Sequence, residues 1–147
     1  DPELRVQVVD QRTAFDTDPD GFSTAVEANQ DALQQRVVEA QQRLSAVTID
    51  DDLRLRISAV CGELDVDGLR GDIVTNRAAR ALAAFEGRTE VSEEDVARVA
   101  SCCLRHRLRK DPLEQVDSGD RVVKVFCKVF ERSESSDRAD FELALAA

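Results

Sequence analysis

The sequence predicts an all-α protein, folded as a small helical bundle. Six segments carry apolar residues at a spacing of three or four, which is typical of a helix with one buried face. Serine and aspartate stand at the starts of several of these segments, where such residues cap helices. No segment shows the alternation of apolar and polar residues that a convincing strand requires.

The composition limits the partners of the chain. Its 147 residues are enough for one domain with a real core. The formal net charge of -10 disfavours nucleic acid and anionic lipid as partners. No apolar stretch reaches the roughly 18 residues that a membrane-spanning helix needs. The chain contains no methionine, so we expect it to be a piece of a longer protein that holds part of the chemistry elsewhere.

Two helices are predicted in the first third of the chain. The first runs from Pro2 to about Ala14, and the composition of 16–21 predicts a turn. A long helix follows from about Gly21 to Ala46 and is predicted to lean on the bundle, a coiled-coil dimer being the less favoured alternative. Asn29 interrupts its apolar stripe, which consists of Phe22, Val26, Leu33, Val37, Ala40 and Leu44.

The next two helices flank a glycine-rich turn. Asp50–Asp52 suit a helix N-terminus. The helix that follows them has an apolar face made of Leu53, Ile57, Val60, Cys61 and Leu64. The fourth helix is predicted over 72–86, with Gly87 at its C-cap. Its inward face is predicted to consist of Val74, Ala78, Ala81, Leu82 and Phe85.

The last two helices are also bounded by clear signals. Ser92 and Asp95 resemble a capping box, and Asp111-Pro112 ends the helix that they start. The sixth helix is predicted over 120–131, and the polar segment from Ser133 onward is predicted to be mostly disordered. The inward faces of these two helices are predicted to consist of Val96, Val99, Ala100 and Cys103, and of Val122, Phe126, Val129 and Phe130.

The segment Gly68-Leu69-Arg70-Gly71 is the strongest candidate site. Glycine lowers helix stability, so two glycines around one arginine indicate a backbone held in a chosen shape. A helix N-terminus presents N–H groups and a partial positive charge, and an arginine there adds donors suited to phosphate oxygens. Pairing of Arg70 with Asp65, Asp67 or Asp72 is an equally good interpretation on the local residues alone.

Other kinds of site are not indicated. The chain has no phosphate-binding loop of the form G-x-x-x-x-G-K-[ST], and it has only one histidine for a catalytic constellation. The four cysteines lack C-x-x-C spacing, so no metal site is predicted. The basic segment from Leu104 to Lys110 is best interpreted as a solvated helix C-terminus, with a subunit contact or an anion site as alternatives.

A resemblance to a known family rests on two stretches. The residues ELDVDGLRGDIVTNRAARALAAFEGRTEVSEEDVARV and CLRHRLRKDPLE resemble the C-terminal helical lid domain of the ATPase subunit I of magnesium chelatase, an AAA+ family. The residues LRVQVVDQRTAFDTDP are similar to the stretch that joins the nucleotide-binding core of that family to the lid. The resemblance covers about 1–130. It implies a connecting helix and turn over 1–20, a lid over 21–132, and an unmatched, disordered tail over 133–147.

The resemblance also implies a function. Gly68, Leu69, Arg70 and Gly71 would form the sensor 2 motif, in which Arg70 reaches the γ-phosphate of ATP. ATP and Mg²⁺ would be held mainly by the core, whose Walker motifs this chain lacks, so the chain alone is expected to be inactive. The intact subunit would form a ring, expected to be a hexamer, and work with subunits D and H to insert Mg²⁺ into protoporphyrin IX for chlorophyll synthesis.

The cysteines, the cellular compartment and two alternative functions are also the subject of predictions. The resemblance implies a redox disulfide between Cys61 and Cys103 that responds to thioredoxin, and two buried free thiols are the alternative. Cys102 and Cys127 are predicted to be exposed. The expected compartment is the chloroplast stroma, or a cyanobacterial cytoplasm. The rival functions are the lid of a MoxR-type AAA+ chaperone, and a helical interaction module without catalysis.

Overall fold

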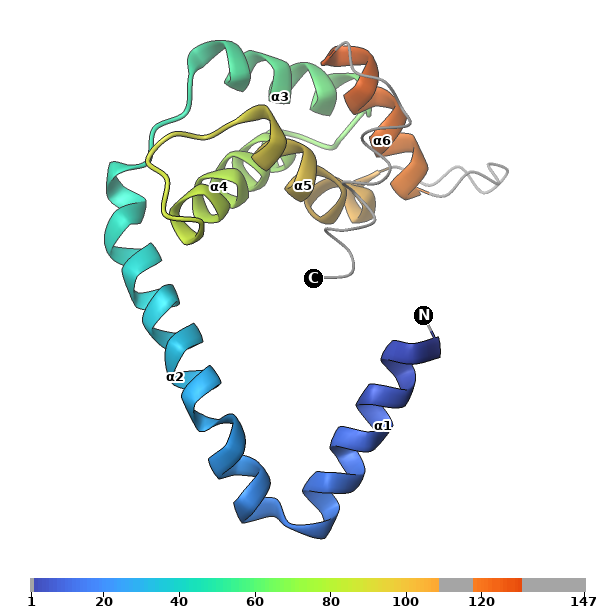
Figure 1. Ribbon diagram of the computed structural model, residues 1–147. Helices are drawn as coiled ribbons and strands as arrows, with labels where there is room; N and C mark the ends of the chain where they lie inside the picture. The colour runs from blue at the N-terminus through green and yellow to red at the C-terminus, as the bar shows by residue number, and fades with distance from the viewer. Residues whose placement is uncertain (1, 109–117, 131–147) are drawn as a thin grey trace. The chain divides into compact units, whose positions relative to one another are not determined.

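The computed structural model describes residues 2–108 and 118–130, and these residues confirm the all-α prediction (Figure 1). The described part contains no strand beyond an isolated parallel bridge between Thr48 and Glu90. Its helices are α1 (Pro2–Thr17), α2 (Pro19–Arg43), η1 (Leu44–Ala46), α3 (Asp51–Glu63), α4 (Arg70–Phe85), α5 (Glu93–Leu104), η2 (Arg105–Arg107) and α6 (Ser118–Val129). No helix in these ranges is long and apolar enough to cross a membrane.

The chain divides into two compact units, Asp1–Glu39 and Ala40–Ala147. In the first unit, the predicted turn over 16–21 is wrong in its extent, because only Asp18 separates α1 from α2. The carboxylate of Asp18 accepts a hydrogen bond of 3.0 Å from the Gly21 N–H, and Pro19 takes the first helical position that proline tolerates. One capping residue therefore replaces the longer turn.

The predicted apolar stripe of the long helix is not buried within the first unit, which holds most of it. No residue of α2 is buried, and Leu33 and Val37 remain 46% and 40% exposed. The helix also ends at Arg43, and Leu44–Ala46 continue as a single 3-10 turn. The physical reason is the thinness of the stripe, since Asn29 interrupts it and polar residues fill the rest of the surface.

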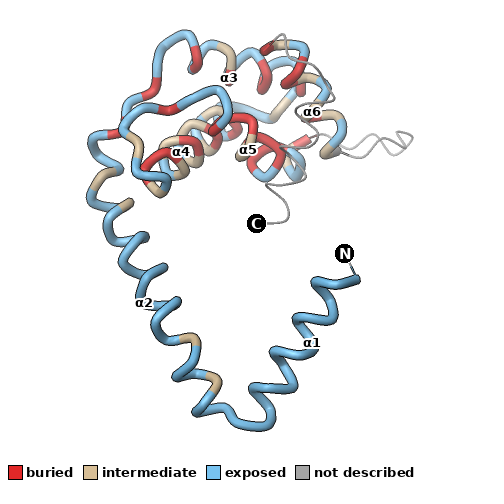
Figure 2. Tube along the Cα trace, in the orientation of Figure 1, coloured by how far each residue is buried: buried red, intermediate tan, exposed pale blue. Residues whose placement is uncertain are grey.

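The core lies in the second unit, where α3, α4, α5 and α6 pack around one apolar cluster (Figure 2). The contact between α4 and α5 is the most extensive of those between helices. Asp50 caps α3 by accepting a hydrogen bond of 3.0 Å from the Asp52 N–H, as predicted. The predicted face of α3 is confirmed, because Leu53, Ile57, Val60, Cys61 and Leu64 are all buried.

The predicted face of α4 is wrong by about one position. Thr75, Ala79 and Ala83 are at most 1% exposed, whereas Ala81 is exposed and Val74 and Ala78 are only partly buried. Small side chains let the axes of two helices approach closely, so the line of small residues faces the neighbouring helices. The larger apolar residues then lie at the edges of the contact. Gly87 follows the C-cap with a φ of 83°, as predicted for the end of this helix.

The last two helices follow the sequence pattern with two exceptions. Ser92 and Asp95 form the predicted capping box of α5, and the rings of Phe126 and Phe130 stack at 4.1 Å between centroids. The predicted exposure of Cys102 is confirmed and that of Cys127 is wrong, since Cys127 is 3% exposed. Because α6 packs against both α3 and α5, its buried face is wide enough to include Cys127. The prediction that Asp111-Pro112 ends the helix started by Ser92 is wrong, because α5 ends at Leu104 and is followed by the 3-10 turn η2 and an extended Leu108. The predicted tail lies outside the described residues.

The segment after α2 is attached to the far end of α4. The guanidinium of Arg43 donates a hydrogen bond of 2.8 Å to the Ala84 carbonyl. In the other direction, Arg80 donates to the carbonyls of Val47 at 3.1 Å and Leu44 at 3.2 Å. These bonds add side-chain donors to carbonyls at the ends of η1 and α4, two of which also accept a backbone N–H, since Val47 donates to Leu44 and Gly87 donates to Ala84. They attach the 3-10 turn to the body of the second unit.

Candidate functional site

The candidate site begins where α3 ends. The N–H of Val66 donates to the Cys61 carbonyl and the N–H of Asp65 donates to the Gly62 carbonyl, both at 3.1 Å. This pair of bonds is the Schellman pattern, and it places Asp65 in the left-handed region with a φ of 51°. The chain is thereby turned sharply away from α3 and toward the start of α4.

The two glycines of the candidate motif serve different purposes. Gly68 has a φ of 64°, a conformation that L side chains rarely adopt, and its surroundings are open. Gly71 is buried, and a Cβ built on it would lie 2.8 Å from Val66 Cγ1 and 3.2 Å from Leu104 Cδ2. One glycine therefore sets the direction of the backbone, and the other lets the first turn of α4 pack closely against its neighbours.

Arg70 occupies a different position from the one predicted. The helix starts at Arg70 rather than at Asp72, so the arginine is the first helical residue instead of preceding the helix. Its N-cap, Leu69, makes no side-chain capping bond and is 73% exposed. A cation at this end opposes the helix dipole, so the local sequence does nothing to stabilise the arginine there.

The side chain of Arg70 is exposed and has no hydrogen bond or ion pair within the part of the chain that the structure describes. The alternative pairing with Asp72 is not formed, since Asp72 instead accepts a hydrogen bond of 2.7 Å from Ser58 Oγ. Arg70 therefore adds an exposed guanidinium to the end of α4 whose first N–H groups have no partner within the helix. This donor set fits one anionic oxygen group, such as a terminal phosphate.

Two buried thiols lie behind this turn. Cys61 Sγ is 3.3 Å from the position of a Cβ on Gly71, and both Cys61 and Cys103 are buried and free. Burial, the charge of Asp72 and a hydrogen bond to Asp72 raise the pKa of Cys61 to about 12, with a smaller contribution from Cys103. Burial also raises the pKa of Cys103. Both thiols are therefore protonated near neutral pH, when they are weak nucleophiles.

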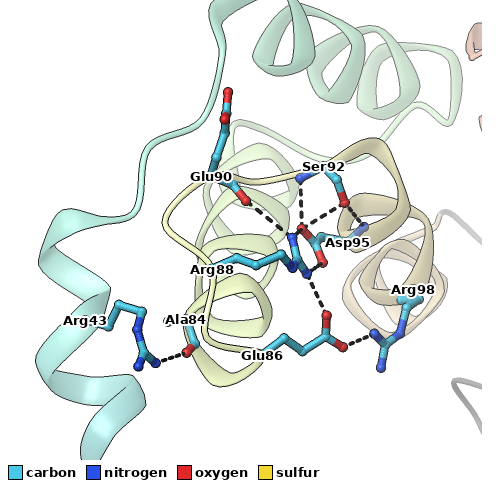
Figure 3. A network of polar contacts seen from close by, with 8 residues as sticks. All are labelled: Arg43, Ala84, Glu86, Arg88, Glu90, Ser92, Asp95 and Arg98. Atoms are coloured by element: carbon cyan, nitrogen blue, oxygen red, sulfur yellow. Dashed lines mark hydrogen bonds and ion pairs between the residues drawn. The ribbon is translucent and has the colours of Figure 1, made fainter.

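The opposite end of α4 carries a polar network that the sequence did not predict (Figure 3). We call it the α4–α5 clamp and define it as Glu86, Arg88, Asp95 and Arg98. Arg88 donates to both carboxylate oxygens of Asp95, at 2.7 and 2.5 Å, and to Glu86 at 2.6 Å. Arg98 pairs with the other oxygen of Glu86. The clamp joins the end of α4 to the first turns of α5.

The clamp favours the ionised forms of its carboxylates. Burial alone would raise the pKa of Asp95, but hydrogen bonds from Arg88 and Ser92 outweigh burial and lower it. Hydrogen bonds from Arg88 and Arg98 lower the pKa of Glu86. Asp95 could be predicted as a capping residue from the sequence. Arg88 lies in the turn between α4 and α5, outside any helical repeat, so the sequence pattern did not predict its ion pair with Asp95.

Two further features bear on what the chain can hold. The described residues contain no group of three or more histidine, cysteine or acidic side chains placed to bind a metal ion. Arg105 and His106 of the basic segment are exposed on η2, and the rest of that segment after Leu108 lies outside the described residues. Of the residues that the structure places, the start of α4 is therefore the best candidate for binding an anion.

Comparison with known proteins places this geometry in a family. Residues 54–125, which include Arg70 and the α4–α5 clamp, match the family described as the AAA lid domain. The chain is 63% identical over 130 residues to the magnesium-chelatase subunit ChlI of Synechocystis, covering 88% of this chain and 36% of that protein.

Relatives from other photosynthetic organisms give the same result. The chain is 60% identical to subunit ChlI of Porphyra purpurea over 134 residues, which are 91% of this chain and 38% of the relative. It is 58% identical to the chloroplastic subunit ChlI of Chlamydomonas reinhardtii over 130 residues, which are 88% of this chain and 31% of the relative. The chain thus spans about a third of the length of these curated relatives.

These matches favour magnesium chelatase over a MoxR-type chaperone or an unrelated helical module. The range 54–125 contains the Gly68–Gly71 turn, α4, α5 with its capping box, and most of α3 and α6. The chain is thus similar over most of its length to the magnesium-chelatase ChlI subunits, and its residues 54–125 match the AAA lid domain.

Proposed function

We propose that this chain is the sensor 2 lid of an AAA+ ATPase subunit of magnesium chelatase. In this proposal Arg70 contacts the terminal phosphate of an ATP molecule that the rest of the subunit holds. The observation that carries the proposal is an exposed arginine without a partner among the described residues, placed at the uncapped N-terminus of α4. Gly68, Leu69 and Gly71 complete the motif and shape the turn around it.

The chemistry follows from charge and position. Phosphoryl transfer gathers negative charge on the oxygens of the transferred group, and a guanidinium placed against them stabilises that charge. Once hydrolysis removes the contact with the terminal phosphate, the main attraction that holds Arg70 near the nucleotide is lost. Because Gly71 packs the first turn of α4 closely against Val66 and Leu104, a shift of this turn would move its neighbours, and hydrolysis would be converted into a movement of the lid.

The wider assembly is part of the same proposal. The subunit would form a ring, expected to contain six copies, and would act with subunits D and H of the chelatase. ATP and Mg²⁺ would be bound mainly by the nucleotide-binding core of the same subunit, and a second Mg²⁺ would be inserted into protoporphyrin IX as substrate. The chloroplastic and cyanobacterial origins of the relatives support the chloroplast stroma or a cyanobacterial cytoplasm as the compartment.

The test compares two arginines of α4 in a full-length subunit that carries this chain. Arg70→Ala should lower the ATPase rate by about 10³-fold, the scale seen when other NTPases lose a comparable arginine. Arg77→Ala is the matched control, since Arg77 is also exposed on α4, and its rate should stay at the wild-type value. ATP binding is measured in parallel. An unchanged rate for Arg70→Ala with ATP still bound would overturn the proposal.

The role of the chelatase partners has a separate test. ATPase activity of the full-length subunit should respond to porphyrin in the presence of the matching H and D subunits. A subunit whose ATPase ignores porphyrin and both partners would instead fit a MoxR-type chaperone. The isolated chain should show no ATPase activity at all, and measurable hydrolysis by it would contradict the assignment of the Walker motifs to the rest of the subunit.

We also propose that Cys61 and Cys103 form a disulfide when thioredoxin is oxidised. Formation of the S–S bond would transfer two electrons and the two thiol protons to the thioredoxin disulfide, which becomes a dithiol, and the new bond would fix α3 to α5. The position of Cys61 beside Gly71 supports this proposal, and the high pKa of Cys61 means that oxidation should be slow. Mass spectrometry of the oxidised protein should find a Cys61–Cys103 peptide. Two free thiols after full oxidation would refute it.

A further inference from the structure

Asp72 connects the turn that carries Arg70 to α3. It is the third residue of α4, and its Oδ1 accepts a hydrogen bond of 2.7 Å from Ser58 Oγ. Ser58 lies on α3, so this bond joins two helices across 14 positions of the sequence. A carboxylate in the first helical turn is favoured by the helix dipole, but the dipole alone does not require a partner on α3.

A second contact holds the same turn. Gly71, next to Asp72, packs so closely that a Cβ on it would lie within 3.3 Å of Val66, Leu104 and Cys61. The first turn of α4 is therefore restrained on one side by packing and on another by the hydrogen bond from Ser58. Both restraints act on residues directly adjacent to Arg70 or one position further along the helix.

Arg70 itself contributes no restraint. Its side chain has no partner among the described residues, and its N-cap makes no capping bond. The direction in which the guanidinium leaves the helix is therefore set by the backbone of the first turn and not by contacts of the side chain. The contacts that fix the backbone of the first turn of α4 therefore also determine which positions the guanidinium of Arg70 can reach.

We propose that Asp72 and Ser58 are positioning residues for Arg70, because their hydrogen bond holds the first turn of α4 in the orientation that presents the guanidinium. This inference rests on the proposed function of Arg70. Loss of the bond would leave the arginine intact but let the turn move, and displacements of about 1 Å at a reacting group can cost 10²-fold in rate. The residues would act through Arg70 and would not touch the nucleotide.

The experiment is a double-mutant cycle on the ATPase activity of a full-length subunit that carries this chain. Ser58→Ala and Asp72→Ala should each lower kcat about tenfold, with little change in the KM for ATP. Asp72→Asn keeps an acceptor oxygen for Ser58 and should retain most of the rate. In the Arg70→Ala background, Ser58→Ala should cause no further loss, because the residue that it positions is already absent.

One control variant and three possible results separate the positioning role of Ser58 and Asp72 from other effects. Asp51→Asn is the matched control, since Asp51 is an acidic residue in the first turn of α3 with a side chain that is 91% exposed, and its rate should not change. Independent, multiplicative losses for Ser58→Ala and Arg70→Ala would overturn the positioning role while leaving the proposed function intact. An unchanged rate for Arg70→Ala alone would overturn the proposed function, and the inference with it. Circular dichroism of each variant identifies a loss that comes from unfolding, which would count against positioning.

Discussion

The two ends of α4 contrast sharply. At the C-terminal end, Gly87 closes the helix in the left-handed region, Arg43 donates to the Ala84 carbonyl, and Arg88 pairs with a buried carboxylate. At the N-terminal end, the helix has no side-chain cap and begins with an exposed cation. One end follows the rules of helix stability, and the other departs from them.

The difference separates an arginine whose contacts the fold explains from one whose position the described contacts do not explain. Arg88 has its donors committed to Asp95 and Glu86, so its role is fully explained by the fold. Arg70 stands at the end of the helix where the dipole disfavours a cation, and no described contact compensates for it. A residue that breaks a local rule without a structural gain marks a functional site. The contrast therefore supports Arg70 as the residue that acts on a ligand.

The largest expected effect on stability lies at the clamp. Asp95→Ala should lower the free energy of unfolding of the chain by about 3 kcal/mol, because it removes a helix cap and leaves Arg88 without its buried partner. Arg70→Ala should leave the free energy of unfolding unchanged or slightly raised, since its side chain has no described partner and the helix dipole disfavours a cation there. Urea unfolding followed by circular dichroism measures both. An equal decrease in the free energy of unfolding for Asp95→Ala and Arg70→Ala would show that the two ends of α4 do not differ in their contribution to stability.

A smaller effect is expected at Gly71. Gly71→Ala should destabilise the chain by about 2 kcal/mol, because its Cβ would overlap Val66 and overpack the first turn of α4. Gly62→Ala on α3 is the control, since a Cβ there meets nothing within 4 Å and alanine is the better helix former. Gly62→Ala should be neutral or slightly stabilising. A Gly71→Ala variant as stable as Gly62→Ala would show that the close approach is not required.

The smallest expected effect is on the acid stability of the clamp. The pKa of Asp95 is lowered in the folded chain from its ordinary value of 3.8, so its contribution to stability is complete above that value and is lost as the pH falls through the lower folded pKa. Asp95→Asn should therefore reduce the slope of stability against pH below about pH 4. Thermal unfolding at a series of acidic pH values checks this. An unchanged slope would mean that Asp95 titrates normally.

Much of the fold could be predicted from local signals. Asp50, Ser92 and Gly87 mark helix ends by bonds and conformations that involve only a few neighbouring residues, and all three act as predicted. The faces of α3 and α6 followed from apolar spacing. The face of α4 did not, because alanines lie on most sides of that helix and spacing alone does not show which line of small residues meets a partner.

The candidate site divides in the same way. The local sequence is enough to predict an arginine between two glycines at a helix start, because turn and helix preferences are properties of adjacent residues. The packing of the helices determines that Gly71 must lack a side chain, that Asp72 accepts a bond from Ser58, and that Arg88 rather than Arg70 has carboxylate partners. These contacts join residues from different helices or across a turn, and their partners are chosen by how α3, α4 and α5 pack, which no local pattern records.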